Sequence, residues 1–341
     1  MLADHLTEAG PSQLASGALA VLAGTDLHAA ATGHSLDPAD LSEAVQVYMA
    51  AGYAALERHT EQRWCQLLIE FPDWEQAESI AAAQLGPRLD ALQRHGVIVG
   101  WWFLRKHPCW RLRLRSTATP DNLSADAHEE IVKALTDLTL AKLIKRWRTS
   151  IYEPEYAAFG GSEAMRIVHD VFCADSQGVL NYARHESSDV GRRELSIILL
   201  YALLQGAGLD WFENGDVFDR VACLRPPSPN PISPDAADNL ADNVRALINI
   251  AAQPTDPILT LSGPAESALA WRDAFRASGQ RLGAAAAAGQ LDRGLRSVLT
   301  HVVIFHWNRL GLSATTQGIL ARAAAAAFLS APDRGSLTVR A

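Results

Sequence analysis

The sequence predicts an α+β fold, in which an antiparallel sheet is flanked by helices. An N-terminal helical segment precedes the sheet, and the C-terminal half is mostly helical. Three observations support this. Residues 110–115 alternate strictly between apolar and basic side chains, which is typical of a strand. Residues 37–56 carry apolar side chains three and four positions apart. Beyond the prolines of residues 226–234, nearly every segment has helical periodicity.

We expect three parts along the chain. Residues 1–60 predict a helical extension that packs on the main domain, because the apolar face of an amphipathic helix must dock on something. Residues 61–333 predict one catalytic domain, and residues 334–341 a loose tail. The expected strands are 64–71, 97–104, 110–114 and 143–151, with helices at 75–94 and 125–142. Further helices are expected at 163–183, 192–205, 236–252, 265–282, 291–309 and 315–329.

Composition and the absence of certain motifs argue against several classes of protein. The 341 residues carry a formal net charge of -8, which argues against a dominant nucleic-acid role. The apolar stretches are shorter than the roughly 20 residues of a membrane span, and no secretory signal is visible. The four cysteines form no Cys-x-x-Cys pair, and phosphate-loop and serine-hydrolase motifs are absent. We therefore expect a cytoplasmic protein that needs no metal, membrane or nucleic acid.

The alternating strand carries three arginines on one face, which we call the arginine row (Arg111, Arg113 and Arg115). Like charges on one strand face repel each other unless anions lie opposite. Two interpretations stay open. The row is either a solvated outer face paired with neighbouring carboxylates, or a site that holds the carboxylates of a substrate or peptide.

Two further groups of residues suggest chemistry. Tyr152 and Glu155 precede the aromatic-glycine sequence at 159–161, and a double glycine permits close backbone approach. Ser297, His301 and His306 share one expected helix. The two histidines are five apart, which is not the spacing of a helical zinc pair. A lone histidine in an apolar run is more often a core residue than a catalyst.

Taken in order, several segments resemble the thiopeptide-type bacteriocin biosynthesis family, whose fold is that of the C-terminal elimination domain of class I lantibiotic dehydratases. These segments are residues 101–115, residues 152–156 with 159–161, Phe172 with Asp175 and Ser176, and residues 306–310. The resemblance implies one of two chemistries. One branch of the family removes glutamate from glutamylated Ser or Thr. The other joins two dehydroalanines by formal [4+2] aza-cycloaddition and expels water and the leader peptide.

Departures from the family pattern favour the second branch. The elimination branch carries an Arg just before its aromatic-Gly-Gly sequence, where this chain has Ala158. It also carries a His four residues before its Asn-Arg pair, where this chain has Ile304. The first arginine of the row, Arg111, stands where the family usually has His. Elimination needs a base and cations, which Ala and Ile do not supply.

The resemblance therefore implies a pyridine synthase of thiopeptide or pyritide biosynthesis. Its expected partners are a precursor peptide, with leader and dehydrated core, and companion dehydratase subunits, and it needs no cofactor. We expect acid–base groups among Tyr152, Glu155, Ser297, His301 and His306. We expect substrate and leader contacts from Arg105, Arg111, Arg113, Arg115, Trp101, Trp110 and Asn308. Two alternatives stay open: a stand-alone glutamate-elimination subunit, and a non-catalytic partner that binds the precursor. The sequence does not decide between a monomer and a homodimer.

Overall fold

The computed structural model describes residues 10–61, 64–116, 125–184, 190–227, 233–252 and 265–329. The chain divides into two compact units, Met1–Arg63 and Trp64–Ala341, which we describe separately. The expected tail at residues 334–341 lies outside the described residues. That the N-terminal segment packs on the main domain stays a prediction.

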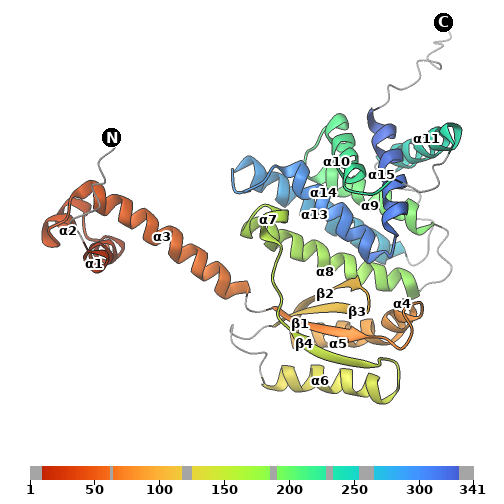
Figure 1. Ribbon diagram of the computed structural model, residues 1–341, viewed down its shortest axis with the longest axis horizontal. Coiled ribbons are helices and arrows are strands. Elements are labelled where there is room, and N and C mark those ends of the chain that lie inside the picture. The colour runs from red at the N-terminus through yellow and green to blue at the C-terminus, as the bar shows by residue number, and fades with distance from the viewer. Residues whose placement is uncertain are drawn as a thin grey trace, which may run out of the picture. The chain divides into compact units, whose positions relative to one another are not determined.

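The N-terminal unit is a small bundle of three helices (Figure 1). They are α1 (Pro11–Leu22), α2 (Leu27–Gly33) and α3 (Pro38–Glu61). The Asp26 side chain caps α2 by accepting hydrogen bonds from the backbone N–H groups of His28 and Ala29. A compact core of small side chains and leucines joins the three helices: Ala18, Ala30, Ala31, Leu36 and Leu41.

The larger unit begins with a four-stranded sheet, which confirms the α+β expectation. The strands are β1 (Trp64–Glu70), β2 (Ile98–Lys106), β3 (Cys109–Ser116) and β4 (Arg146–Ser150), in the order β2-β3-β1-β4. Every neighbouring pair is antiparallel. Between β1 and β2 the chain forms α4 (Ala77–Ile80), a π-helical turn (Ala81–Leu85) and α5 (Gly86–Arg94). Between β3 and β4 it forms α6 (Ala125–Leu140), completing a β-α-β-β-α-β unit.

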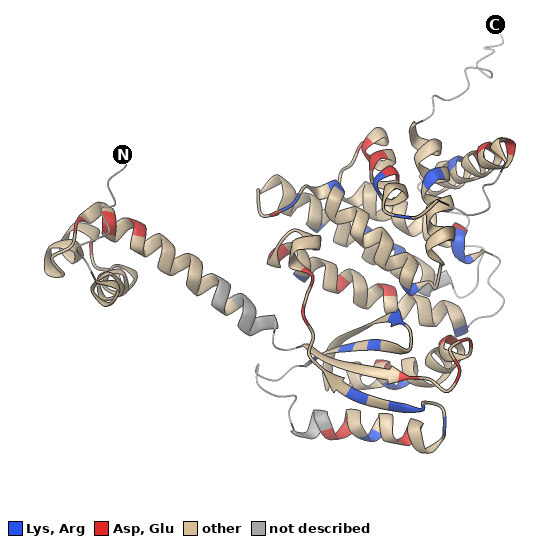
Figure 2. Cartoon of the chain, viewed as in Figure 1, with Lys and Arg blue, Asp and Glu red and all other residues tan. Residues whose placement is uncertain are grey.

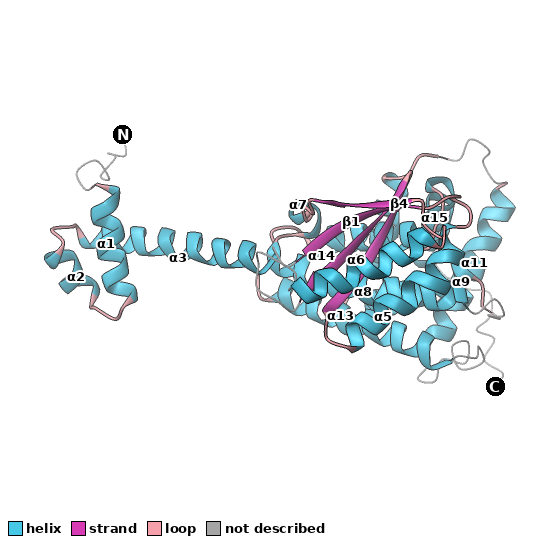
Figure 3. Cartoon of the chain, turned by 90° about the horizontal axis from the view of Figure 1, so that it is seen from below, coloured by secondary structure: helices cyan, strands magenta, loops and turns pink. Residues whose placement is uncertain are grey.

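Helices cover both faces of this sheet (Figures 1 and 3). Figure 1 shows α5 and α6 on one side and α8 (Ser162–Arg184) on the other. The α8 side carries the arginine row: Arg115 lies 3.8 Å from Asp170 of α8. On the same side, the ring of Trp102 packs 4.7 Å from that of Phe172. The arginine row therefore faces a helix along part of its length, and is not an open outer face.

The rest of the unit is helical, as the sequence predicts. Its elements are α7 (Tyr156–Phe159), α9 (Arg192–Gly206), α10 (Trp211–Cys223), α11 (Pro234–Ala251), α13 (Ala265–Ala287), α14 (Leu295–Arg309) and α15 (Ala314–Leu329). The periodicity did not predict α7 or α10, and α14 begins four residues later than expected, after Gly294. In the described ranges, no helix has the length and apolar character needed to cross a membrane.

A buried ionic group, which we call the Asp175 network (Asp175, His306 and Arg309), joins α8 to α14. The Asp175 carboxylate lies 2.8 Å from Nδ1 of His306 and accepts a hydrogen bond of 3.0 Å from Arg309. Asp175 and Arg309 are 0% exposed and His306 is 1% exposed. The next residue, Ser176, accepts a hydrogen bond from the backbone N–H of Phe103 in β2. Two consecutive residues of α8, Asp175 and Ser176, thus bind this helix to α14 and to the sheet.

We expect Asp175→Ala to destabilise the protein by about 3–5 kcal/mol, because it leaves the buried Arg309 charge without its carboxylate. Asp170→Ala is the matched control on the same helix. Asp170 pairs with Arg115 and Arg281 near the surface, so its loss should change stability by only ~0–1 kcal/mol. Urea unfolding of both variants measures the difference. Equal losses would mean that the Asp175 network does not hold α8 and α14 together.

Candidate functional site

A cluster of polar side chains gathers where β4 leads into α7, and we call it the Tyr152 cluster (Tyr152, His169, Arg113, Gln66 and Glu155). The hydroxyl of Tyr152 lies 2.8 Å from Nε2 of His169 on α8. The Arg113 guanidinium, from β3, lies 4.4 Å from the centre of the Tyr152 ring and 4.0 Å from that of Trp102. Three separate elements thus meet at one tyrosine.

Gln66 of β1 holds two parts of the Tyr152 cluster in place through hydrogen bonds. Its side-chain oxygen accepts a hydrogen bond of 2.9 Å from Nε of Arg113. Its side-chain nitrogen donates a hydrogen bond of 2.8 Å to the backbone carbonyl of Ile151. Gln66 is 6% exposed, so both bonds are protected from water. One amide therefore positions both the guanidinium and the backbone segment that carries Tyr152.

Burial sets the charge state of the cluster. Desolvation, followed by the positive charges of Arg115 and Arg113, lowers the pKa of His169 to about 3. His169 is therefore neutral at pH 7. Desolvation also lowers the pKa of Arg113 to about 10, opposed by the nearby Tyr152 and Glu155. Arg113 remains cationic at neutral pH.

Two buried polar atoms of the cluster are unsatisfied. Nη1 of Arg113 and Oε2 of Glu155 have no hydrogen-bond partner in the part of the chain that the structure describes. Buried polar groups are nearly always paired in folded proteins, so unpaired atoms point to a missing ligand or water. The cluster therefore offers one donor and one acceptor to a bound molecule, in addition to the Tyr152–His169 pair.

The other three expected catalytic residues have contacts of their own in the structure. Ser297 lies at the start of α14, and its hydroxyl accepts a long hydrogen bond from Arg220 of α10. His306 is buried in the Asp175 network, where a peptide arriving from solvent does not reach it. His301 lies on α14 with its ring centre 6.0 Å from that of Phe159 on α7. Of the five expected residues, Tyr152 and Glu155 both act on Arg113: the Tyr152 ring lies 4.4 Å from its guanidinium, and the charge of Glu155 opposes the desolvation that lowers its pKa.

The expected binding residues divide in the same way. Trp101 and Trp110 are core residues, 0% and 1% exposed, and Trp110 stacks on Phe103 at 4.5 Å. Their burial does not support the expectation that they contact substrate. Arg105 forms a buried ion pair of 2.8 Å with Glu78.

The remaining expected contacts have local roles in the structure. The Asn308 side-chain oxygen accepts a hydrogen bond from Gln317 of α15. The arginine row contains three different environments: Arg113 is buried, Arg115 faces Asp170, and Arg111 lines a surface hollow. A fully solvated row is therefore contradicted at Arg113, and binding of substrate carboxylates by the row stays a prediction.

Sequence reasoning missed His169 and Gln66. A signal for His169 existed, because it occupies the apolar stripe of α8 between Met165 and Phe172, where the other side chains are apolar or buried. A polar residue in such a stripe needs a partner. Gln66 carried no comparable signal, because it lies in a short strand with buried side chains on both faces.

The positions that depart from the family pattern lie where α7 meets α14. Ala158 is half-buried on α7 and Ile304 is 8% exposed on α14. The ring centre of Phe159 on α7 lies 5.1 Å from that of Phe305 on α14, so the contact between the two helices is apolar. No group of three or more His, Cys, Asp or Glu side chains suited to a metal ion occurs within the described ranges.

Comparison with known proteins identifies relatives of this fold. Residues 64–328 match the sequence profile of the lantibiotic biosynthesis dehydratase C-terminal family. The tRNA-dependent lantibiotic dehydratase MibB from Microbispora sp. 107891 is similar in structure, with a TM-score of 0.56 and 20% identity over 76% of this chain. This chain spans 28% of the length of MibB. No curated protein matches in sequence.

Two smaller solved structures are similar along almost their whole length. TsrL has a TM-score of 0.50 and 15% identity, covering 76% of this chain and 93% of its own. TbtD, the pyridine synthase of thiomuracin biosynthesis, has a TM-score of 0.50 and 13% identity, covering 78% of this chain and 97% of its own. At these identities the likeness establishes the fold alone, and the family rests on the sequence profile. The profile match confirms the resemblance inferred from the sequence: this chain belongs to the lantibiotic dehydratase C-terminal family.

Proposed function

We propose that the protein is a pyridine synthase, which modifies a ribosomally made precursor peptide. In this reaction two dehydroalanines of the peptide join by formal [4+2] aza-cycloaddition. Loss of water and of the leader peptide then gives a pyridine macrocycle. The observation that carries the proposal is the contact of 2.8 Å between the Tyr152 hydroxyl and the neutral His169, together with the unpaired atoms of Arg113 and Glu155.

The cycloaddition requires one amide to become a 2-azadiene, which moves a proton from the amide nitrogen to the amide oxygen. In the proposed step the Glu155 carboxylate accepts the N–H proton, and the Tyr152 hydroxyl donates a proton to the oxygen. His169 holds the hydroxyl in place and stays neutral. The two terminal carbons of the azadiene, the former carbonyl carbon and the CH2 carbon of the first dehydroalanine, then form two C–C bonds with the alkene carbons of the second dehydroalanine. Transfer of a proton from Glu155 back to Tyr152 restores the starting state.

Positioning supplies most of the remaining rate enhancement in this proposal. Dehydroalanines are neutral, so a site for them needs shape more than charge. Holding two reacting groups in near-attack geometry contributes roughly 7–11 kcal/mol at best. Positioned acid–base groups typically add 10²–10⁴-fold. The apolar contact between α7 and α14, with Ala158 and Ile304, suits such a substrate better than a departing glutamate.

Glutamate elimination is the second candidate, and a specific observation favours it. Nη1 of Arg113 and Nε of Arg115 are buried without hydrogen-bond partners among the described residues. Two such donors are suited to a carboxylate. Against this, the positions where the family's elimination branch has an Arg and a His hold Ala158 and Ile304.

Mass spectrometry of a purified reaction separates the candidates. The protein alone, without nucleotide or aminoacyl-tRNA, is incubated with an azole-containing precursor that already holds two dehydroalanines. We expect a cyclic product and a released leader. A companion dehydratase would then supply the dehydroalanines in the cell. Elimination of glutamate from a glutamylated precursor, with the dehydrated peptide left linear, would reject the proposal. Binding without any product would favour a non-catalytic partner.

We expect Tyr152→Phe to slow cyclisation by about 10²–10⁴-fold while peptide affinity stays nearly constant, because the variant removes one proton donor and keeps the ring. Tyr201→Phe is the matched control, since Tyr201 lies on α9 against Phe328. Single-turnover rates and equilibrium binding are measured for both variants. A parallel loss of rate and affinity in Tyr152→Phe would mark this residue as structural.

The neutrality of His169 has a consequence for stability. Its pKa is about 3 in the folded protein, below the ordinary 6.5, so the unfolded chain binds the extra proton first. Between pH 6.5 and 3 the wild-type protein therefore loses stability as the pH falls. His169→Gln keeps a hydrogen-bonding side chain but has no group to protonate. Between pH 7 and pH 5, we expect its free energy of unfolding to fall by about 2 kcal/mol less than that of the wild type. Urea unfolding at both pH values measures this, and identical losses would show that His169 is not held neutral.

A further inference from the structure

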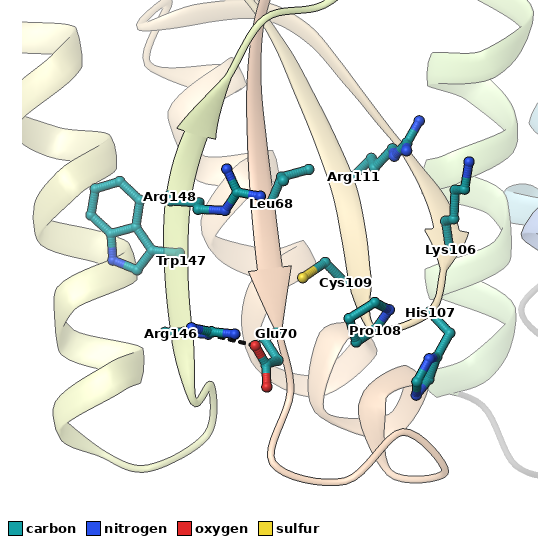
Figure 4. A pocket seen from close by; sticks show the side chains of 10 residues that line it. All are labelled: Leu68, Glu70, Lys106, His107, Pro108, Cys109, Arg111, Arg146, Trp147 and Arg148. Carbon is teal, nitrogen blue, oxygen red and sulfur yellow. Dashed lines mark hydrogen bonds and ion pairs between the residues drawn. The ribbon is translucent and has the colours of Figure 1, made fainter.

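A basic hollow opens on the sheet beyond the Tyr152 cluster (Figure 4). Its volume is about 280 Å³. It is bounded by the hairpin between β2 and β3 and by strands β1, β3 and β4. The lining residues are Leu68, Glu70, Lys106, His107, Pro108, Cys109, Arg111, Arg146, Trp147 and Arg148. We propose that this hollow is a docking site for an acidic peptide segment, bound in extended form beside β4.

The charge of the hollow is strongly unbalanced. Four permanently cationic side chains, Lys106, Arg111, Arg146 and Arg148, face one carboxylate, Glu70. Glu70 is already engaged, because Lys145 donates to it at 2.7 Å and Arg146 donates to its other oxygen. These two hydrogen bonds lower the pKa of Glu70, so it stays ionised. Within the described residues, Lys106, Arg111 and Arg148 have no carboxylate partner.

The register of the sheet gives these cations a repeating pattern. Leu68 of β1 is paired with Arg111 of β3 on one side and with Arg148 of β4 on the other. Two guanidinium groups therefore flank one leucine on the same face of the sheet. Figure 2 shows the basic residues recurring along β3 and β4. Side chains on one strand face recur every ~6.6–6.8 Å, so a peptide with acidic residues at alternate positions matches this spacing.

The edge of the sheet provides main-chain partners for such a peptide. β4 is the last strand in the order β2-β3-β1-β4 and pairs only with β1 among the described strands. Four of its five residues are exposed. An edge strand presents N–H and C=O groups that an extended peptide can pair with, while its side chains are read in neighbouring pockets.

A peptide fits this hollow better than a nucleic acid does. Nucleic-acid binding uses long tracks of cations, whereas this chain has a net charge of -8 and one compact basic hollow. The hollow also has apolar lining at Leu68 and Pro108, which suits the side chains between two acidic residues. Carboxylates are in addition natural partners of guanidinium forks.

The hollow lies next to the Tyr152 cluster along β3. Arg111 lines the hollow and Arg113, two residues along the same strand face, lies in the cluster. β4 likewise runs from Arg146 and Arg148 towards Tyr152. That the docked segment is the leader of the modified precursor rests on the proposed function. The docking site itself does not depend on which reaction the cluster performs.

Binding of a synthetic probe tests the inference without any turnover. The probe is a fluorescein-labelled ten-residue peptide with Glu at alternate positions, and its binding to the full chain is followed by anisotropy. We expect binding that weakens by about tenfold or more in Arg111→Ala/Arg148→Ala. It should also weaken when salt rises from about 50 mM to about 500 mM, because exposed charges are screened. Arg111→Gln/Arg148→Gln, which keeps polar side chains of similar reach, should give the same loss.

A matched control variant distinguishes binding at the hollow from a general effect of the protein's net charge. Arg94→Ala/Lys133→Ala removes two exposed cations from α5 and α6 and should leave binding unchanged. Three results would overturn the inference. The first is that both hollow variants bind the probe with wild-type affinity. The second is that the control variant loses as much affinity as the hollow variants. The third is that a peptide with Gln in place of Glu binds the wild-type protein as tightly as the probe does. Tighter binding of single-stranded DNA, lost in the same variants, would instead identify a nucleic-acid site. Tyr152→Phe should bind the probe normally, so failure of the proposed chemistry and failure of docking are distinguishable.

Discussion

The buried pairing of Asp175 with Arg309 is the interaction on which the arrangement of the larger unit depends. Each charge is 0% exposed, and an isolated charge at that depth is strongly unfavourable. The two groups therefore have to stay together, and they fix α14 against α8. The Arg309 guanidinium also lies 4.3 Å from the centre of the Phe172 ring, which packs on Trp102 of the sheet. Sheet, α8 and α14 thus form one layered structure, and His169 reaches Tyr152 because α8 is held at this position.

Strand alternation predicted the sheet well but not the environment of its faces. Residues 110–115 do form a strand, with Trp110, Leu112 and Leu114 buried in the core. The opposite face was expected to be either solvated or a binding row. In the structure α8 covers the middle of that face, so Arg113 is 2% exposed. Alternation identifies which side chains share a face, but only tertiary packing decides what covers it.

The helices were predictable where periodicity was long, and less so where it was short. Helices α8, α9, α11, α13 and α15 follow the expected spacing closely. Helix α10 was missed, although Asp210 and Glu213 form a capping box, which is a sequence-level signature of a helix start. Helix α7 has only four residues and no periodicity to detect. Prediction of the candidate site from the sequence was limited in the same way. Tyr152 and Glu155 stand in a distinctive local motif, whereas His169 and Gln66 join them only through contacts between elements distant in sequence.

A single strand face carries two arginines whose surroundings suit them to different tasks. Arg113 lies beneath α8 between two aromatic rings, where desolvation lowers its pKa to about 10 and its geometry is fixed by Gln66. Arg111 lies two residues away, where α8 no longer covers the sheet, and it faces the basic hollow. A dry, rigid guanidinium is suited to orienting a reacting group, because little reorganisation is needed at the moment of reaction. A hydrated one is suited to attracting and holding a charged segment, because it loses little on binding. The partial cover of one sheet face by one helix therefore places the proposed site for chemistry two residues along β3 from the proposed site for recognition.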